Sequence, residues 1–108
     1  MTPVTIQHGI WKAVIVPDFG MNVISLTCQG KEIMRRPKDF AELEDRPRLF
    51  GIPILIPANR TAEGIFTFEG KTHENFFPIN EPARNNNVHG LMSTAPFEVV
   101  SHTENSLT

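Results

Sequence analysis

The sequence has little of what marks disulfide-bonded, secreted and membrane-spanning proteins. Its 108 residues include a single cysteine, Cys28. One thiol cannot form an internal disulfide or a multi-thiolate metal site, and we expect it to be a buried, inert side chain. The longest apolar run, Ile52 to Pro57, is far too short to span a bilayer. The first five residues lack the basic start and the apolar stretch of a signal peptide, so we expect a cytoplasmic protein with no membrane partner.

An excess of charge of one sign is also absent. The sequence has 10 basic and 12 acidic residues, which gives a net charge of −2 with neutral histidines. Binding to a phosphate backbone depends on a basic surplus, so we expect no nucleic-acid partner. No two histidines stand at metal-ligand spacing, so we expect no metal site. No glycine-rich phosphate-binding loop follows a predicted strand. The histidines are His8, His73, His89 and His102.

Proline, in contrast, is plentiful, with 9 residues, and 7 glycines are also spread along the chain. Both residue types break long helices and favour short strands joined by turns, which predicts an all-β fold of antiparallel strands. Two runs rich in β-branched residues, 11–16 and 22–28, flank the turn sequence Pro-Asp-Phe-Gly and predict a hairpin. One short helix is predicted over residues 38–44, and it is limited to about two turns because Pro37 and Pro47 bound it.

The second half of the sequence alternates short predicted strands with a long polar loop. Prolines at both ends of residues 52–57 predict an edge strand or an irregular buried strand. Residues 65–68 and 72–74 predict another hairpin. Residues 75–90 contain three consecutive asparagines and predict a loop of about 15 residues. Residues 97–101 predict a strand, which a turn joins to what resembles the start of one more.

This pattern predicts a single but incomplete domain over residues 1–108. The last three residues cannot complete a hairpin ladder, and they leave the preceding strand as an open edge. We therefore expect the chain to be the N-terminal portion of a longer β protein. Open strand edges also allow copies of the chain to associate with one another.

Three polar residues near these predicted strands are candidates for ligand binding. Arg60 follows an apolar segment, and its guanidinium offers five fixed donors, while Asn59 supplies both a donor and an acceptor. His89 stands at the end of the asparagine-rich loop and can donate or accept near neutral pH. Together these groups suit a neutral, hydroxyl-rich ligand. On spacing alone, a solvated or structural Arg60 and an ordinary loop histidine at His89 remain open alternatives.

The same residues belong to a longer pattern. Asn59-Arg60 precedes Gly64-Ile65-Phe66-Thr67-Phe68-Glu69-Gly70, and Asn86-Asn87-Val88-His89-Gly90 follows. Their order and spacing resemble the N-terminal third of the aldose 1-epimerases, or galactose mutarotases. The resemblance implies part of a galactose-mutarotase-like β-sandwich, a supersandwich of antiparallel sheets. It also implies a cofactor-free reaction that interconverts the α and β anomers of an aldose by acid–base catalysis.

The resemblance further implies roles for single residues. It makes Asn59, Arg60 and His89 sugar-binding residues, with an aldose of the galactose or glucose class as partner. The family's acid, a later histidine, and its base, a glutamate near the C-terminus, have no matching position in this sequence. No catalytic residue is therefore predicted, and we expect the chain alone to be inactive.

Two departures from the family pattern leave the ligand open. Leu91 stands where many members have a second glycine after the His-Gly pair, and the framing prolines Pro53 and Pro57 resemble a branch that includes hexose-phosphate epimerases. A phosphorylated sugar is one alternative. A non-catalytic carbohydrate-binding module that uses the same cleft is another.

Overall fold

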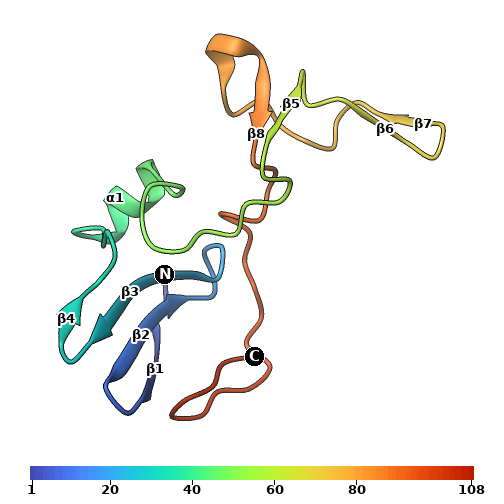
Figure 1. Cartoon of the computed structure of the whole chain (residues 1–108). Helices are drawn as coiled ribbons and strands as arrows, with labels where there is room; N and C mark the ends of the chain where they lie inside the picture. Colours follow the sequence, from blue (N-terminus) through green and yellow to red (C-terminus); the bar gives the residue numbers. More distant parts are fainter. The chain divides into compact units, whose positions relative to one another are not determined.

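A computed structural model describes residues 1–108 and divides them into two compact units. The first unit comprises residues 1–54 and 93–108, and the second comprises residues 55–92. Figure 1 draws the elements of both units. The prediction of a single domain over residues 1–108 stays a prediction.

A four-stranded antiparallel sheet forms the body of the first unit (Figure 1). Its strands are β1 (Val4–His8), β2 (Trp11–Val16), β3 (Asn22–Cys28) and β4 (Lys31–Glu32). They pair in chain order as a meander, and β2 with β3 is the predicted hairpin. The pairing of this hairpin shifts between Val14 and Ile15, as in a β-bulge. β1 is not among the predicted strands, and Cys28 is a half-buried free thiol rather than the fully buried one expected.

The hydrophobic core of the first unit lies between the sheet and the segment of residues 43–50 that follows it in the sequence. Val16 and Ile24 of the sheet pack with Leu43 and Phe50, and each of the four is at most 4% exposed. Residues 16 and 24 lie on the two central strands, so the apolar face of the hairpin faces this cluster. Burial of four such side chains is the main source of stability in a unit of this size.

The one helix, α1 (Phe40–Asp45), carries Leu43 into that core. It begins two residues later than predicted because Asp39 caps it. The Asp39 carboxylate accepts a 2.8 Å hydrogen bond from the backbone N–H of Glu42, which satisfies one free donor of the first turn. The helix ends before Pro47, as the sequence predicts.

Asn22 attaches the segment after the helix to the sheet. Its side chain is fully buried. Its Nδ2 donates to the carbonyl oxygen of Phe50 at 3.1 Å, and its Oδ1 accepts from the backbone N–H of Ile52 at 2.9 Å. Ile52 also forms a single bridge with Val23. Residues 52–57 form only isolated bridges, and Ile52 and Ile56 are more than half exposed, so the predicted edge or irregular buried strand is wrong.

The predicted strand at residues 97–101 is wrong. The segment runs without regular pairing and is held by single bonds, such as the one from the Phe97 N–H to the carbonyl oxygen of Pro17 at 3.0 Å. Further along, Gln7 of β1 donates to the carbonyl oxygen of Glu104 at 2.6 Å. The Val100 N–H donates to the carbonyl oxygen of Thr108 at 2.8 Å, so the β-branched residues 99–100 pair with no neighbouring strand.

The second unit contains two short ribbons. Strand β5 (Arg60–Ala62) pairs antiparallel with β8 (Asn86–Val88), and β6 (Phe66–Phe68) forms the predicted hairpin with β7 (Lys71–His73). The Phe66 ring stacks on His73, with ring centroids 4.8 Å apart. The predicted loop 75–90 is corrected in part, because it contains β8 and a 3₁₀ turn, η1 (Pro82–Arg84).

The observed class is therefore mostly antiparallel strands with one short helix, as predicted. The helix of six residues falls well short of the length and apolar character that crossing a membrane would require.

Candidate functional site

The register of the β5–β8 ribbon sets the positions of the predicted site residues. Arg60 pairs with Val88, and Ala62 pairs with Asn86. His89 follows directly after β8, and Asn59 directly precedes β5, so the two lie at the same end of the ribbon. The backbone N–H of His89 donates to the carbonyl oxygen of Asn59 at 3.0 Å. Two motifs thirty residues apart in the sequence thus meet in the structure.

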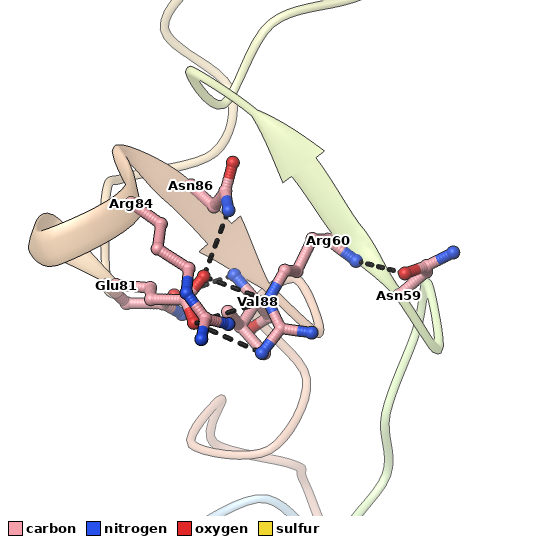
Figure 2. A network of polar contacts seen from close by, with 7 residues as sticks. Asn59, Arg60, Glu81, Arg84, Asn86 and Val88 are labelled. Carbon is pink, nitrogen blue, oxygen red and sulfur yellow. Dashed lines mark hydrogen bonds and ion pairs between the residues drawn. The ribbon is translucent and has the colours of Figure 1, made fainter.

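The guanidinium of Arg60 is held by a carboxylate that the sequence pattern did not single out (Figure 2). Its Nε donates to Oε2 of Glu81 at 2.9 Å, and its Nη2 donates to Oε1 at 3.1 Å. This is a bidentate pair, the geometry in which arginine and carboxylate fit best. The side chain of Arg60 is 47% exposed and that of Glu81 is 22% exposed. The pair therefore lies at the surface of the second unit, with the carboxylate on its inner side.

Glu81 is itself fixed by the turn that carries it. Asn86 and Glu81 exchange backbone hydrogen bonds of 3.1 and 3.2 Å, and Nδ2 of Asn86 donates to Oε2 of Glu81 at 3.0 Å. Arg84 adds a longer contact of 3.5 Å to Oε1. Because Asn86 belongs to β8, the carboxylate is tied to the strand that pairs with Arg60. The guanidinium is thus held from across the ribbon.

These contacts change the titration of both partners. The hydrogen bonds from Arg60 and then from Asn86 lower the pKa of Glu81 from 4.5 to about 2. Burial opposes this change, and the positive charges of Arg60 and Arg84 add smaller effects that lower the pKa. The same hydrogen bond and the negative charge of Glu81 raise the pKa of Arg60 above its ordinary value. Arg60 is therefore a permanent cation and a donor only.

Two asparagines shape the loop that presents His89. Asn80 acts like a short piece of strand, since its Oδ1 accepts from the N–H of Val88 at 2.7 Å and its Nδ2 donates to the Val88 carbonyl at 3.0 Å. Asn87 is fully buried, and its Nδ2 donates to the Pro78 carbonyl at 2.8 Å. Its Oδ1 accepts from the N–H of Gly90 at 2.9 Å. Amide side chains therefore replace backbone pairing on both sides of His89.

Gly90 is required by close approach and by backbone conformation. Its φ is +65°, a region that residues with a Cβ rarely adopt, and a Cβ at this position would collide with the backbone carbonyl oxygen of Ile56. His89 just before it also has a positive φ, of +64°. Its Nδ1 is buried without a hydrogen-bond partner. The turn at His89 and Gly90 therefore depends on a backbone conformation that residues with a Cβ rarely adopt.

The structure brings the three predicted residues to one end of the ribbon without making all of them converge. Asn59 uses its Oδ1 to accept from the backbone N–H of Arg60 at 2.8 Å, which leaves its Nδ2 free. Figure 2 shows the guanidinium of Arg60 reaching toward Glu81, with the Asn59 side chain on the other side of the strand. Three of the five guanidinium N–H groups, including both on Nη1, remain without a protein acceptor.

The sequence pattern does not predict the roles of Glu81, Asn80 and Asn87. The signal for Glu81 is its place one residue before Pro82, at the N-terminal end of a turn. Spacing alone does not reveal that this carboxylate faces Arg60, because the two are 21 residues apart and meet only through the pairing of β5 with β8.

Other chemistry finds less support in the structure. No group of three or more His, Cys, Asp or Glu side chains is arranged to hold a metal ion. A hollow of about 300 Å³ lies on the first unit beside α1, and none of Asn59, Arg60 and His89 lines it. The β5–β8 ribbon is therefore the place where the polar groups of the predicted site gather.

Comparison with known proteins confirms the resemblance of the sequence to the aldose 1-epimerases. The chain matches the family model described as aldose 1-epimerase over residues 3–108. A solved structure of a galactose mutarotase-like protein from Clostridium acetobutylicum is similar, with a TM-score of 0.80 and 36% sequence identity over 92% of this chain and 30% of that one. A putative aldose 1-epimerase from Escherichia coli K12 has a TM-score of 0.77 at 20% identity, over 98% of this chain and 34% of that one, and shows the fold alone. The chain thus spans about a third of the length of these solved structures.

Proposed function

Because this chain belongs to the aldose 1-epimerase family, we propose that residues 55–92 serve the sugar-binding side of an aldose 1-epimerase reaction. The reaction interconverts the α and β anomers of an aldose. Asn59, Arg60 and His89 hold sugar oxygens in this proposal. The acid and the base that open and close the ring are supplied by residues outside these 108.

The observation that carries the proposal is the hydrogen bond from the His89 N–H to the Asn59 carbonyl. It joins the Asn-Arg motif and the His-Gly motif at one end of the β5–β8 ribbon. The free donors near that end are Nδ2 of Asn59 and the Nη1 group of Arg60, which lie on opposite sides of β5 (Figure 2). Neutral hydroxyl and ring oxygens accept from donors of this kind, and fixed donors orient a sugar better than mobile ones.

The chemistry of these residues suits binding rather than proton transfer. Ring opening requires removal of a proton from the C1 hydroxyl and delivery of one to the ring oxygen. Asn59 does not titrate, and Arg60 stays protonated because Glu81 raises its pKa. Only His89 has a titratable ring. A single imidazole cannot serve as acid and base on two separate oxygens at once, so the proposal assigns it to holding the sugar.

Titration of the ¹⁵N-labelled chain with galactose, followed by NMR, tests the proposal. We expect saturable shifts of the backbone amides at residues 59–60 and 88–90. Arg60→Gln should weaken binding at least about fivefold, since it removes a charged donor. Lys71→Gln, a matched charge removal on the exposed β6–β7 hairpin, should change it less than about twofold. Absence of shifts at these amides, or an equal effect of both substitutions, would overturn the proposal.

A further inference from the structure

The bond pattern at Arg60 determines which part of the guanidinium is available. Glu81 occupies the Nε and Nη2 edge with contacts of 2.9 and 3.1 Å. The Nη1 end has no protein acceptor, and the side chain as a whole is 47% exposed. The carboxylate, being less exposed and tied to Asn86, is the fixed partner of the two. The Nη1 end is therefore the part of the guanidinium that is free to bind a ligand, and the pairing with Glu81 fixes the plane of the group.

The same carboxylate sets the charge around that end. Without Glu81, the guanidinium groups of Arg60 and Arg84 would give two positive charges side by side, and Glu81 reduces this to one. The rest of the second unit adds no basic surplus, because it has three basic and four acidic residues in all. Each positive charge that no carboxylate neutralises increases the affinity for a dianionic phosphate ester, whereas it increases the affinity for a neutral hydroxyl only slightly.

We propose that Glu81 is a positioning residue of this site, which fixes Arg60 by its Nε edge, presents the Nη1 end to the sugar and biases the site toward uncharged sugars over sugar phosphates. The selectivity rests on the function proposed above, and the positioning of Arg60 does not. The sequence leaves a free and a phosphorylated aldose as alternatives. In this proposal Glu81, which lies outside the Asn-Arg and His-Gly motifs, favours the free aldose.

Three variants of the full chain separate orientation from charge. Glu81→Gln keeps the length of the side chain and removes its charge. Glu81→Asp keeps the charge but shortens the side chain by one methylene, which moves the carboxylate away from the guanidinium. Glu74→Gln removes a carboxylate of the same unit that bonds neither Arg60 nor Arg84. The backbone bonds between Glu81 and Asn86 do not use the substituted side chain, and the amide signals of β5 and β8 report whether the unit stays folded.

Solvent exchange of the Arg60 Nε–H, measured by NMR, tests the positioning without any sugar. We expect exchange at least about tenfold faster in Glu81→Gln and in Glu81→Asp than in the parent chain, because a charge-assisted bidentate pair is lost in each. Glu74→Gln should leave it unchanged. Equal exchange in the parent chain and both Glu81 variants would overturn the assignment of Glu81 as a positioning residue.

Titrations with galactose and with galactose 6-phosphate test the selectivity. The ratio of phosphate to galactose affinity should rise about threefold in Glu81→Gln and stay within error in Glu81→Asp and Glu74→Gln. A ratio that does not change in Glu81→Gln, while the parent chain binds galactose, overturns the selectivity alone. A parent chain that binds neither ligand overturns the proposed function and the selectivity with it, and the exchange measurement still decides the positioning.

Discussion

The backbone N–H of His89 and the carbonyl oxygen of Asn59 lie 3.0 Å apart and form a hydrogen bond at the end of the β5–β8 ribbon. This contact places the residue before Arg60 against the residue before Gly90. The ribbon is only three residue pairs long, so its geometry depends on the side chains that flank it. Substitutions in those flanking residues are therefore the sharpest tests of how the site is built.

Gly90→Ala should destabilise the second unit by at least about 2 kcal/mol. The new Cβ would collide with the Ile56 carbonyl oxygen and would force an L-residue to a φ of +65°. Gly70→Ala is the matched control, since Gly70 has a φ of +76° and no atom within 4 Å of the added Cβ. It should show only the conformational penalty of about 1 kcal/mol. Urea unfolding followed by the amide signals of residues 55–92 measures both, and equal losses would contradict the packing argument.

Asn87→Asp should loosen the loop before His89. It replaces a buried donor with a carboxylate that faces the Pro78 carbonyl oxygen, and at neutral pH this should reduce stability by about 2–4 kcal/mol. Hydrogen exchange of the Gly90 amide, which Asn87 holds, should accelerate accordingly. Asn85→Asp makes the same chemical change at an exposed residue with a φ of +53°, a conformation that aspartate tolerates. A comparable acceleration in that control would show that negative charge, rather than the lost bond, is responsible.

Asn22→Ala should destabilise the first unit by about 2–3 kcal/mol. It leaves the buried Phe50 carbonyl without its side-chain donor and removes one of two acceptors from the part-buried Ile52 N–H. Asn75→Ala, at an exposed position, should stay within about 0.5 kcal/mol of the parent chain. Urea unfolding followed by Trp11 fluorescence provides the comparison. A loss below about 1 kcal/mol would mean that the post-helix segment is held chiefly by Phe50.

The ion pair at Glu81 should produce an acid-sensitive contribution to stability. Its pKa in the folded chain, about 2, is below the ordinary value of 4.5, so the contribution is fully present above about pH 4.5 and is lost as the pH falls toward 2. The difference in urea midpoint between the parent chain and Glu81→Gln should therefore shrink over that interval. Direct titration of the Glu81 carboxyl carbon by NMR should give a midpoint near 2, and a midpoint at 4.5 would contradict the pairing with Arg60.

Much of the fold could be predicted because local signals agree with the final pairing. The hairpin of β2 and β3 has β-branched strands on both sides of a turn sequence, and β6 and β7 flank the turn residues Glu69-Gly70. The strand predicted at residues 97–101 does not form, because there the local signal has no matching partner strand. Its residues favour strands, but pairing needs a partner edge, and the structure offers this segment only single hydrogen bonds.

The candidate site was predictable in its residue types and not in its contacts. Asn59, Arg60 and His89 are visible as polar groups next to predicted strands. β8 is hidden, because its Asn-Asn-Val sequence has low strand propensity and is stabilised by the amide of Asn80 acting on Val88. Glu81 follows from β8, since only the pairing of that strand with β5 brings the carboxylate to Arg60. Pairing between segments distant in the sequence therefore forms β8 and the contact of Glu81 with Arg60, which local propensity does not predict.

The proposed role of Asn59, Arg60 and His89 is to hold a sugar and to leave proton transfer to other residues. Polarimetry of freshly dissolved α-galactose tests it most directly, with the chain present at galactose concentrations that give half-maximal NMR shifts. We predict that optical rotation relaxes at the rate of buffer alone, because an acid or a base each typically contributes about 10²–10⁴-fold and neither is assigned here. Accelerated relaxation that His89→Ala abolishes would show that His89 transfers a proton, which contradicts the proposed role.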